Sequence, residues 1–244
     1  MKLGWLSASL GLWLLSVPAN AQDDTTAFIE ANLLATLYHE LGHALIDIEG
    51  VPIYGQEEDA ADVLSILLID AFYEEEDAVA LAYDTAFGFL GEAERSKAQG
   101  LAPAYWDVHG PDEQRYFNLV CLFYGADPDE RDDVAADLGL PDDRAEYCPD
   151  EFDQANAAWG AILDEISAGA PGNTILLGEL DADYSEAADL IRSEVDLLNE
   201  DFALSAELTV HLAPCGEPNA FYDPGTAEIT MCSEYVDYLA ELAR

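Results

Sequence analysis

Residues 28–48 carry the feature that most constrains the fold, an apolar stripe at helical spacing. The stripe consists of Leu34, Leu37, Leu41, Leu45 and Ile48. This period is typical of an amphipathic α-helix, which Gly50 and Pro52 would end. His39 and His43 are four residues apart and lie off the stripe. The helix can therefore bury its leucines and still present both imidazoles to a cleft.

The segment His39-Glu40-x-x-His43 has the composition of a metal site. Residues four apart share a helix face, so two imidazoles can bind one ion, and zinc accepts nitrogen ligands. Glu40 can reach a water molecule on that ion without being a ligand, which is how a glutamate acts as general base in metallopeptidases. Gly42 is unfavourable in a helix and would let a second segment approach the metal face. A chance motif is the alternative, and it is disfavoured because the chain has only 4 histidines. We expect one Zn²⁺ per chain.

A catalytic zinc site takes three protein ligands, so a third is needed. His109 and His211 are candidates, but Glu58 lies closer in the sequence. A second helix is predicted from about Glu57 to Tyr73, and the loop before it would let it turn back against the first. Glu58 and Asp62 share a face of this helix. We expect Glu58 to be the third ligand and Asp62 to accept a hydrogen bond from a ligand imidazole.

Two alternatives concern the same acidic segment and His109. Glu57, Glu58 and Asp59 could simply stabilise a helix N-terminus, where negative charge is favourable. His109 precedes a predicted helix that carries Arg115, and near the metal it could stabilise the transition state of a hydrolysis. A structural role for the His109 segment is the other interpretation. We expect Arg115 to have an ion-pair partner, because basic residues are rare in this chain.

The rest of the chain divides into two compositional parts. Helical spacing predicts further helices at about 75–99, 111–124, 150–167 and 185–200, and β-like runs lie at 174–180, 207–213 and 228–232. Residues 168–173, Ala-Gly-Ala-Pro-Gly-Asn, are typical of a linker or turn. We therefore expect a mainly helical α+β fold. A helical region at 22–168 and a C-terminal α/β module at 174–244 would pack together as one catalytic unit.

Residues 219–232, NAFYDPGTAEITMC, predict a strand, a turn at Asp223-Pro224-Gly225 and a second strand. The edge of this hairpin could hold a peptide by β-augmentation, in which an extended peptide adds a strand to a sheet. A hairpin that only covers the core is an equally good interpretation. His211 lies in the predicted strand before it, where we expect it to be a packing residue.

The 4 cysteines are Cys121, Cys148, Cys215 and Cys232. An even number in a chain expected to be exported indicates two disulfides, for which three pairings are possible. We expect Cys121–Cys148 and Cys215–Cys232, because each pair closes a short local loop. No CxxC spacing occurs, so the sequence does not favour a cysteine-bound metal.

Residues 1–21, MKLGWLSASLGLWLLSVPANA, have the pattern of a secretory signal peptide with a small-x-small cleavage site at Ala19-Asn20-Ala21. We expect a mature chain that starts at Gln22, has no membrane span and is periplasmic or secreted. The formal net charge of −43 would repel nucleic acid. It would suit cationic partners or a salty environment, although a solvated acidic surface is the simpler interpretation.

A resemblance to known families rests on these motifs. Glu58-x-x-Ala61-Asp62 after His39-Glu40-x-x-His43 resembles the Glu-zincin pattern of several metallopeptidase families, including the HtpX-like and CAAX-protease families. More closely, the chain is similar to a bacterial family of metallopeptidase-like proteins catalogued as a domain of unknown function. The matching stretches are HELGHALID at 39–47, GQEEDAAD at 55–62, GPDEQRYFNLVCLFYGADP at 110–128 and CGEPNAFYDPGTAEITMC at 215–232. The resemblance implies zinc peptidase chemistry, with the glutamate as third ligand and the aspartate supporting a histidine.

The order of elements departs from the zincin pattern. In zincins the β-sheet whose edge strand holds substrate lies before the metal helix, whereas the β-like runs here come after it. Either the C-terminal part folds back into that position, as in a circular permutation, or the substrate cleft is built differently.

The sequence as a whole predicts an exported zinc metallopeptidase that hydrolyses peptide or protein substrates, with Glu40 as the base. The alternative from another class is a zinc-containing binding or scaffold protein that captures a cationic partner with its acidic surface. Glu40 favours the enzyme, because a structural zinc site does not need it. A metallohydrolase for a non-peptide amide is a third possibility.

Overall fold

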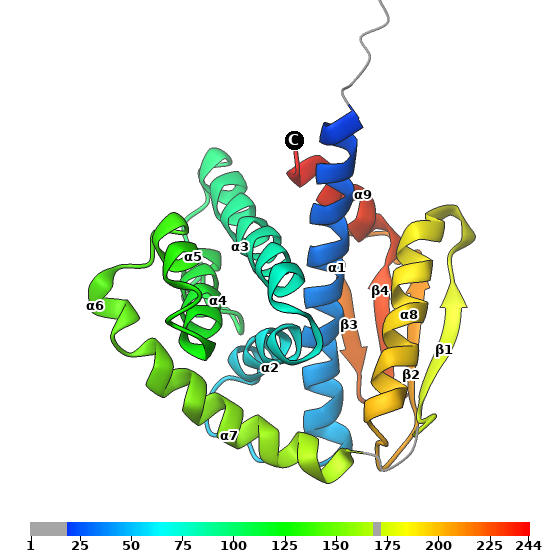
Figure 1. The fold of residues 1–244 in the computed structure, drawn as a ribbon. Coiled ribbons are helices and arrows are strands. Elements are labelled where there is room, and N and C mark those ends of the chain that lie inside the picture. Colours follow the sequence, from blue (N-terminus) through cyan, green and yellow to red (C-terminus); the bar gives the residue numbers. More distant parts are fainter. Residues whose placement is uncertain (1–18, 168–171) are drawn as a thin grey trace, which may run out of the picture.

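Helix α1 (Ala19–Ile48) stands between the other helices and a small β-sheet (Figure 1). The computed structural model describes residues 19–167 and 172–244. The helices on one side of α1 are α2 (Glu57–Phe72), α3 (Glu75–Ala98), α4 (Asp112–Ala126), α5 (Asp132–Asp137), α6 (Asp142–Ala145) and α7 (Cys148–Ile166). The fold is thus mainly helical α+β, as predicted.

The apolar stripe of α1 is buried, but so is most of the rest of the helix. Leu34, Leu37, Leu41 and Leu45 lie in the core, as the spacing predicts. Leu33 and Tyr38, which are not in the stripe, are buried as well. The reason is that α2 and α3 pack on one side of α1 while strands and C-terminal helices pack on the other. A helix with layers on both sides is apolar nearly all round.

Helices α1 and α2 cross in close contact at Gly42. A Cβ atom added at Gly42 would lie 2.8 Å from the Cα of Ala61 and 3.0 Å from its Cβ. The glycine and the alanine therefore let the two backbones approach one another. This crossing fixes the N-terminal turns of α2 against the face of α1 that carries His39 and His43.

The C-terminal part forms a four-stranded sheet in the order β1-β2-β4-β3. The strands are β1 (Ile175–Leu180), β2 (Leu208–Ala213), β3 (Ala220–Asp223) and β4 (Glu228–Cys232). The first three in this order are parallel, with α8 (Ser185–Asp201) as the crossover between β1 and β2 after a short 3-10 turn, Ala182–Tyr184. Strand β3 pairs antiparallel with β4 and lies at the edge of the sheet.

Strand β3 also packs beside α1. The Tyr222 hydroxyl donates a hydrogen bond of 2.8 Å to Asp47 Oδ2 near the end of α1. A last helix, α9 (Ser233–Leu242), follows β4 and packs on α1 and α3. The C-terminal part therefore folds back onto α1, the helix that carries His39 and His43. Both parts contribute to one apolar core.

The structure contains the disulfides Cys121–Cys148 and Cys215–Cys232, the two pairs that the sequence predicts. The first joins α4 to α7, and the second ties β4 to the loop before β3. Within the described residues, each helix is too short or too polar to cross a membrane. Most of the predicted signal peptide, residues 1–18, lies outside the described residues, as do residues 168–171 of the predicted linker.

Candidate metal centre

Three ligand atoms from α1 and α2 form a nearly regular triangle. His39 Nε2 and His43 Nε2 lie 3.2 Å apart, and each lies 3.2 Å from Glu58 Oε2. The helical spacing of the histidines and the α1–α2 crossing produce this arrangement together. The structure thus brings together the three residues that the sequence predicts as ligands.

A fourth ligand atom comes from the loop between α3 and α4. His109 Nε2 lies 2.9 Å from the same Glu58 Oε2. Its ligand atom and those of His39 and Glu58 all lie within 4.8 Å of one another, close enough to hold one ion. His109 therefore lies in the candidate metal centre, a position that the sequence considered only as one of several for this residue.

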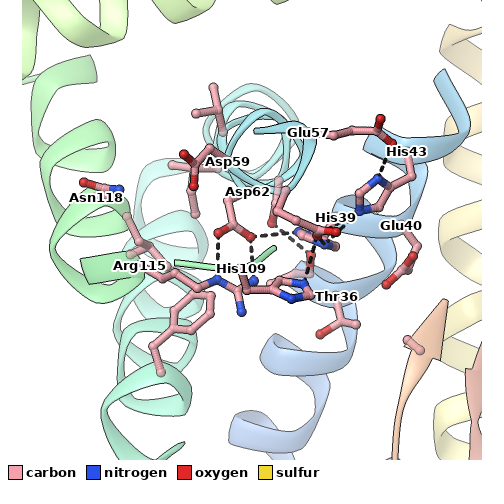
Figure 2. A pocket seen from close by; sticks show the side chains of 18 of the residues that line it. Thr36, His39, Glu40, His43, Glu57, Asp59, Asp62, His109, Arg115 and Asn118 are labelled. Carbon is pink, nitrogen blue, oxygen red and sulfur yellow. Dashed lines mark hydrogen bonds and ion pairs between the residues drawn. The ribbon is translucent and has the colours of Figure 1, made fainter. Parts of the chain in front are cut away.

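A buried ion pair supports the His39 side of the centre (Figure 2). His39 Nδ1 lies 2.8 Å from Asp62 Oδ1, so a proton on Nδ1 is held there and Nε2 faces the centre. Arg115 in turn donates two hydrogen bonds to Asp62, of 2.8 and 2.7 Å, and stacks 4.4 Å from the ring centre of Phe89. Asp62 is the partner that we expected Arg115 to have.

The second histidine has a carboxylate partner that the sequence did not reveal. His43 Nδ1 lies 2.8 Å from Glu57 Oε1, and Figure 2 shows this pair at the outer side of α2. The sequence treated Glu57 only as a helix N-terminal charge. Its neighbour Glu58 turns its carboxylate to the Nε2 side of the same ring, so consecutive residues of α2 contact opposite nitrogens of His43.

The charges of these groups favour a cation at the centre. Burial lowers the pKa of His39, but hydrogen bonds with Asp62 and Glu58 outweigh burial and raise that pKa to about 9. The pKa of His43 is raised in the same way by Glu58 and Glu57 against the effect of burial. Burial raises the pKa of Glu58, yet hydrogen bonds from His109, His39 and His43 hold it far below its usual range. A bound metal cation would balance the charge of the Glu58 carboxylate.

Glu40 lies between the two histidines on α1 and is buried. Burial raises the pKa of its carboxyl, while the charges of His39 and His43 oppose this rise. Figure 2 shows the carboxylate on the side of α1 that points away from α2. Glu40 lines the same cleft as His39, His43 and Glu58, so it can contact a molecule bound in that cleft.

A cleft with a volume of about 1530 Å³ contains the whole centre. This exceeds the range of roughly 300–1,000 Å³ that is usual for small-molecule pockets. One wall is formed by β3 and its flanking residues, Pro218, Asn219, Ala220, Phe221, Tyr222 and Pro224. The cleft is large enough for an extended polymer chain and has the edge of the sheet along it.

The C-terminal helix adds a tyrosine to this cleft that the sequence did not single out. Tyr235 of α9 lines the cleft, and its hydroxyl lies 3.3 Å from Thr36 Oγ1, one helical turn before Glu40 on α1. The apolar residues of α9 at 236, 239 and 242 have helical spacing, so the sequence contained a signal for this helix. No local sequence pattern predicts the position of α9 next to α1.

His211 lies apart from the centre, on β2. Its Nδ1 accepts a hydrogen bond of 2.9 Å from the backbone N–H of Glu179, and Gly178 leaves room for its ring. It is only partly buried, on the sheet face opposite to Val210 and Leu212. His211 packs against β1, as expected for a residue outside the metal centre.

Comparison with known proteins places the chain in a family. A family model described as "Putative metallopeptidase" matches residues 16–163 and 181–244. These ranges include the histidine motif, α2, the His109 loop and the β3–β4 hairpin. No curated protein and no solved structure matched the chain. Because the family model covers most of its length, the chain belongs to this family of metallopeptidase-like proteins.

Proposed function

We propose that this protein is an exported zinc peptidase that hydrolyses peptide bonds in the cleft between α1, α2 and β3. The observation that carries the proposal is the triangle of His39 Nε2, His43 Nε2 and Glu58 Oε2, with the buried Glu40 in the lining of the same cleft. Family membership supports the same chemistry.

The donor set fits zinc. Two imidazole nitrogens and one carboxylate oxygen are the ligands of a known class of catalytic zinc sites. Zinc bonds of about 2.0–2.1 Å in a tetrahedron place neighbouring ligand atoms roughly 3.3 Å apart. The three separations of 3.2 Å agree with this value. His39, His43 and Glu58 would hold the ion, and Asp62 and Glu57 would fix the orientation of the two rings.

Glu40 acts as the general base. A bound zinc ion supplies Lewis-acid chemistry, lowering the pKa of water and polarising a carbonyl group. The Glu40 carboxylate accepts a proton from the attacking water and then donates it to the nitrogen of the departing amine. Burial of Glu40 raises the pKa of its carboxyl, which makes the carboxylate a stronger base for the first of these two transfers.

Strand β3 is the part of the cleft that holds substrate. It is an edge strand, so one side of its backbone is not paired within the sheet. An extended peptide can pair with such an edge and lie across the cleft beside Glu40. Acidic side chains line this cleft: Glu40, Asp47, Glu57, Glu58, Asp59, Asp62, Glu92, Asp112 and Glu151. We therefore propose that extended peptide segments rich in lysine and arginine are the preferred substrates.

Export is proposed from the N-terminal pattern and from the disulfides. Residues 1–21 have the composition of a signal peptide, and both disulfides are stable in an oxidising compartment. Mass spectrometry of the protein from the periplasm or medium should find Gln22 as its first residue. Retention of residues 1–21 on a cytoplasmic protein would contradict this.

The proposed activity is tested by metal removal and return. Zinc-loaded protein should cleave an unfolded basic protein, lose the activity when a chelator removes the zinc, and regain it when zinc is added. Glu58→Ala should lose zinc and activity, while the control variant Asp59→Ala, at the neighbouring exposed carboxylate, should keep its zinc. Zinc binding without cleavage of any peptide or protein would favour a zinc-containing binding protein instead.

A further inference from the structure

The ligand atoms of the metal centre form two triangles that share one edge. The shared edge joins His39 Nε2 and Glu58 Oε2, which are 3.2 Å apart. His43 Nε2 completes the first triangle at 3.2 Å from both atoms, and His109 Nε2 completes the second at 2.9 Å from Glu58 Oε2. The chain thus brings four donor atoms to the centre, and His109 lies close enough to His39 and Glu58 to share one ion with them.

Four protein ligands are one more than a zinc peptidase uses during turnover. Structural zinc sites are closed by four ligands, whereas catalytic sites keep one position for water or substrate. With His109 in place, the position needed for hydrolysis is filled by the protein itself. Glu40 would then face a centre that cannot admit its substrate.

The four ligands differ in what holds them. His39, His43 and Glu58 are on long helices that cross at Gly42 and Ala61. His109 is on the loop between α3 and α4. Three large apolar side chains of this loop are unusually exposed. Tyr105 is 82% exposed, Trp106 86% and Val108 63%. A ligand on such a loop can leave while the other three stay.

Contacts within the loop orient His109. The backbone N–H of His109 donates to Asp107 Oδ1 at 3.2 Å, and its Nδ1 lies on the side of the same carboxylate, 3.7 Å away. Two further backbone hydrogen bonds stay within the loop, from Tyr105 to Pro103 and from Asp107 to Ala104, while the Leu101 N–H binds Ser96 O at the end of α3. The loop can therefore move as a unit.

We propose that His109 is a displaceable fourth metal ligand that holds the resting enzyme in a closed state. This inference rests on the proposed function, and it names the regulation of the same site. When the loop at 101–110 moves away, His109 leaves Glu58 and the vacated position becomes available to water and substrate. The exposed side chains of Tyr105 and Trp106 give a peptide substrate an apolar surface with which to stabilise the open loop.

Cobalt(II) substitution tests the proposal without relying on turnover. The visible absorption of bound Co²⁺ depends on the number and type of its ligands, so His109→Ala should change the spectrum, whereas His211→Ala should not. Acetohydroxamate, which needs an open metal position, should bind the His109→Ala protein at least about tenfold more tightly than wild type. A tenfold difference means that His109 occupies its position in roughly nine of ten resting molecules. Zinc retention against a chelator should fall by at least about tenfold in the variant, since a ligand contributes no less than the group that orients it.

Hydrolysis by the fully zinc-loaded variant should rise by the same factor of about ten. Unchanged Co²⁺ spectra and equal hydroxamate affinity in wild type and His109→Ala would overturn the inference and leave the proposed peptidase intact. A variant with the same spectrum but slower hydrolysis would also overturn it and assign His109 to transition-state stabilisation. Absence of metal binding in wild type would overturn both proposals. His109→Gln serves as a second variant if the alanine protein unfolds.

Discussion

The two histidines of α1 reach the metal centre from opposite surroundings. On the inner side, His39 contacts Asp62, which accepts two hydrogen bonds from Arg115. The side chains of Asp62 and Arg115 are only 23% and 18% exposed. On the outer side, His43 is held by Glu57, whose side chain is 51% exposed. The two imidazole–carboxylate distances are nevertheless the same, 2.8 Å.

This difference shows that equal geometry does not mean equal energy. A charge pair that is exposed to water contributes little, because solvent screens it and can replace either partner. A buried pair has lost its water, so removal of one partner leaves the other without compensation. The inner side should therefore determine both the stability of the helix packing and the retention of metal, while the outer side should mainly orient a ring.

The largest effect is expected for Arg115→Ala. It leaves Asp62 largely buried with only His39 as partner, so the free energy of unfolding should fall by roughly 3 kcal/mol, the lower end for breaking a buried pair. Urea denaturation at neutral pH measures this. Burial raises the pKa of Asp62, but Arg115 and His39 hold it well below its usual range. The pair's contribution should therefore be fully present above about pH 4 and be lost as the pH falls further. A destabilisation below about 1 kcal/mol would show that water screens the inner pair as it screens surface pairs.

Asp62→Asn is expected to have the next largest effect. It keeps the size of the side chain but weakens the hydrogen bond that orients His39, so zinc affinity should fall by roughly ten- to a hundredfold. Competition with a chelator of known affinity measures the change. The rate of hydrolysis at limiting zinc should fall along with the zinc affinity, and it should largely recover at saturating zinc. Loss of activity at full zinc occupancy would instead place Asp62 in the chemical step.

Glu57→Gln makes the matched change on the outer side and should have the smallest effect. Because the Glu57 side chain is half exposed, water can take its place at His43, and zinc affinity should fall by less than about tenfold. The same competition assay applies. If Glu57→Gln lowers the zinc affinity as much as Asp62→Asn does, burial does not distinguish the two sides of the centre and the comparison fails.

Local spacing was sufficient to predict which side chains of α1 and α2 meet. His39, His43, Glu58 and Asp62 are placed by helical periodicity within each helix and by the short loop between the two helices. Gly42 was expected to allow a close approach, and Ala61 is the residue that makes it. The disulfide pairs were also predictable because their loops are local.

Contacts between distant segments could not be predicted in this way. The Glu57–His43 pair depends on the angle at which α2 crosses α1, which no residue spacing gives. Tyr235 and β3 reach the cleft only because the C-terminal part folds back on α1, about 200 residues later in the chain. His109 was considered in several roles, since a single histidine in a loop has no periodicity to fix its position.

The central claim is that Glu40 is the base of a metal-dependent hydrolysis. The most direct test is Glu40→Gln, which keeps the shape of the side chain but removes its basicity. Zinc content and the temperature of unfolding should stay close to those of wild type, because His39, His43 and Glu58 remain. Hydrolysis of an unfolded protein should fall by at least about a hundredfold, the lower end for loss of a general base. Cleavage by zinc-loaded Glu40→Gln at the wild-type rate would contradict the account.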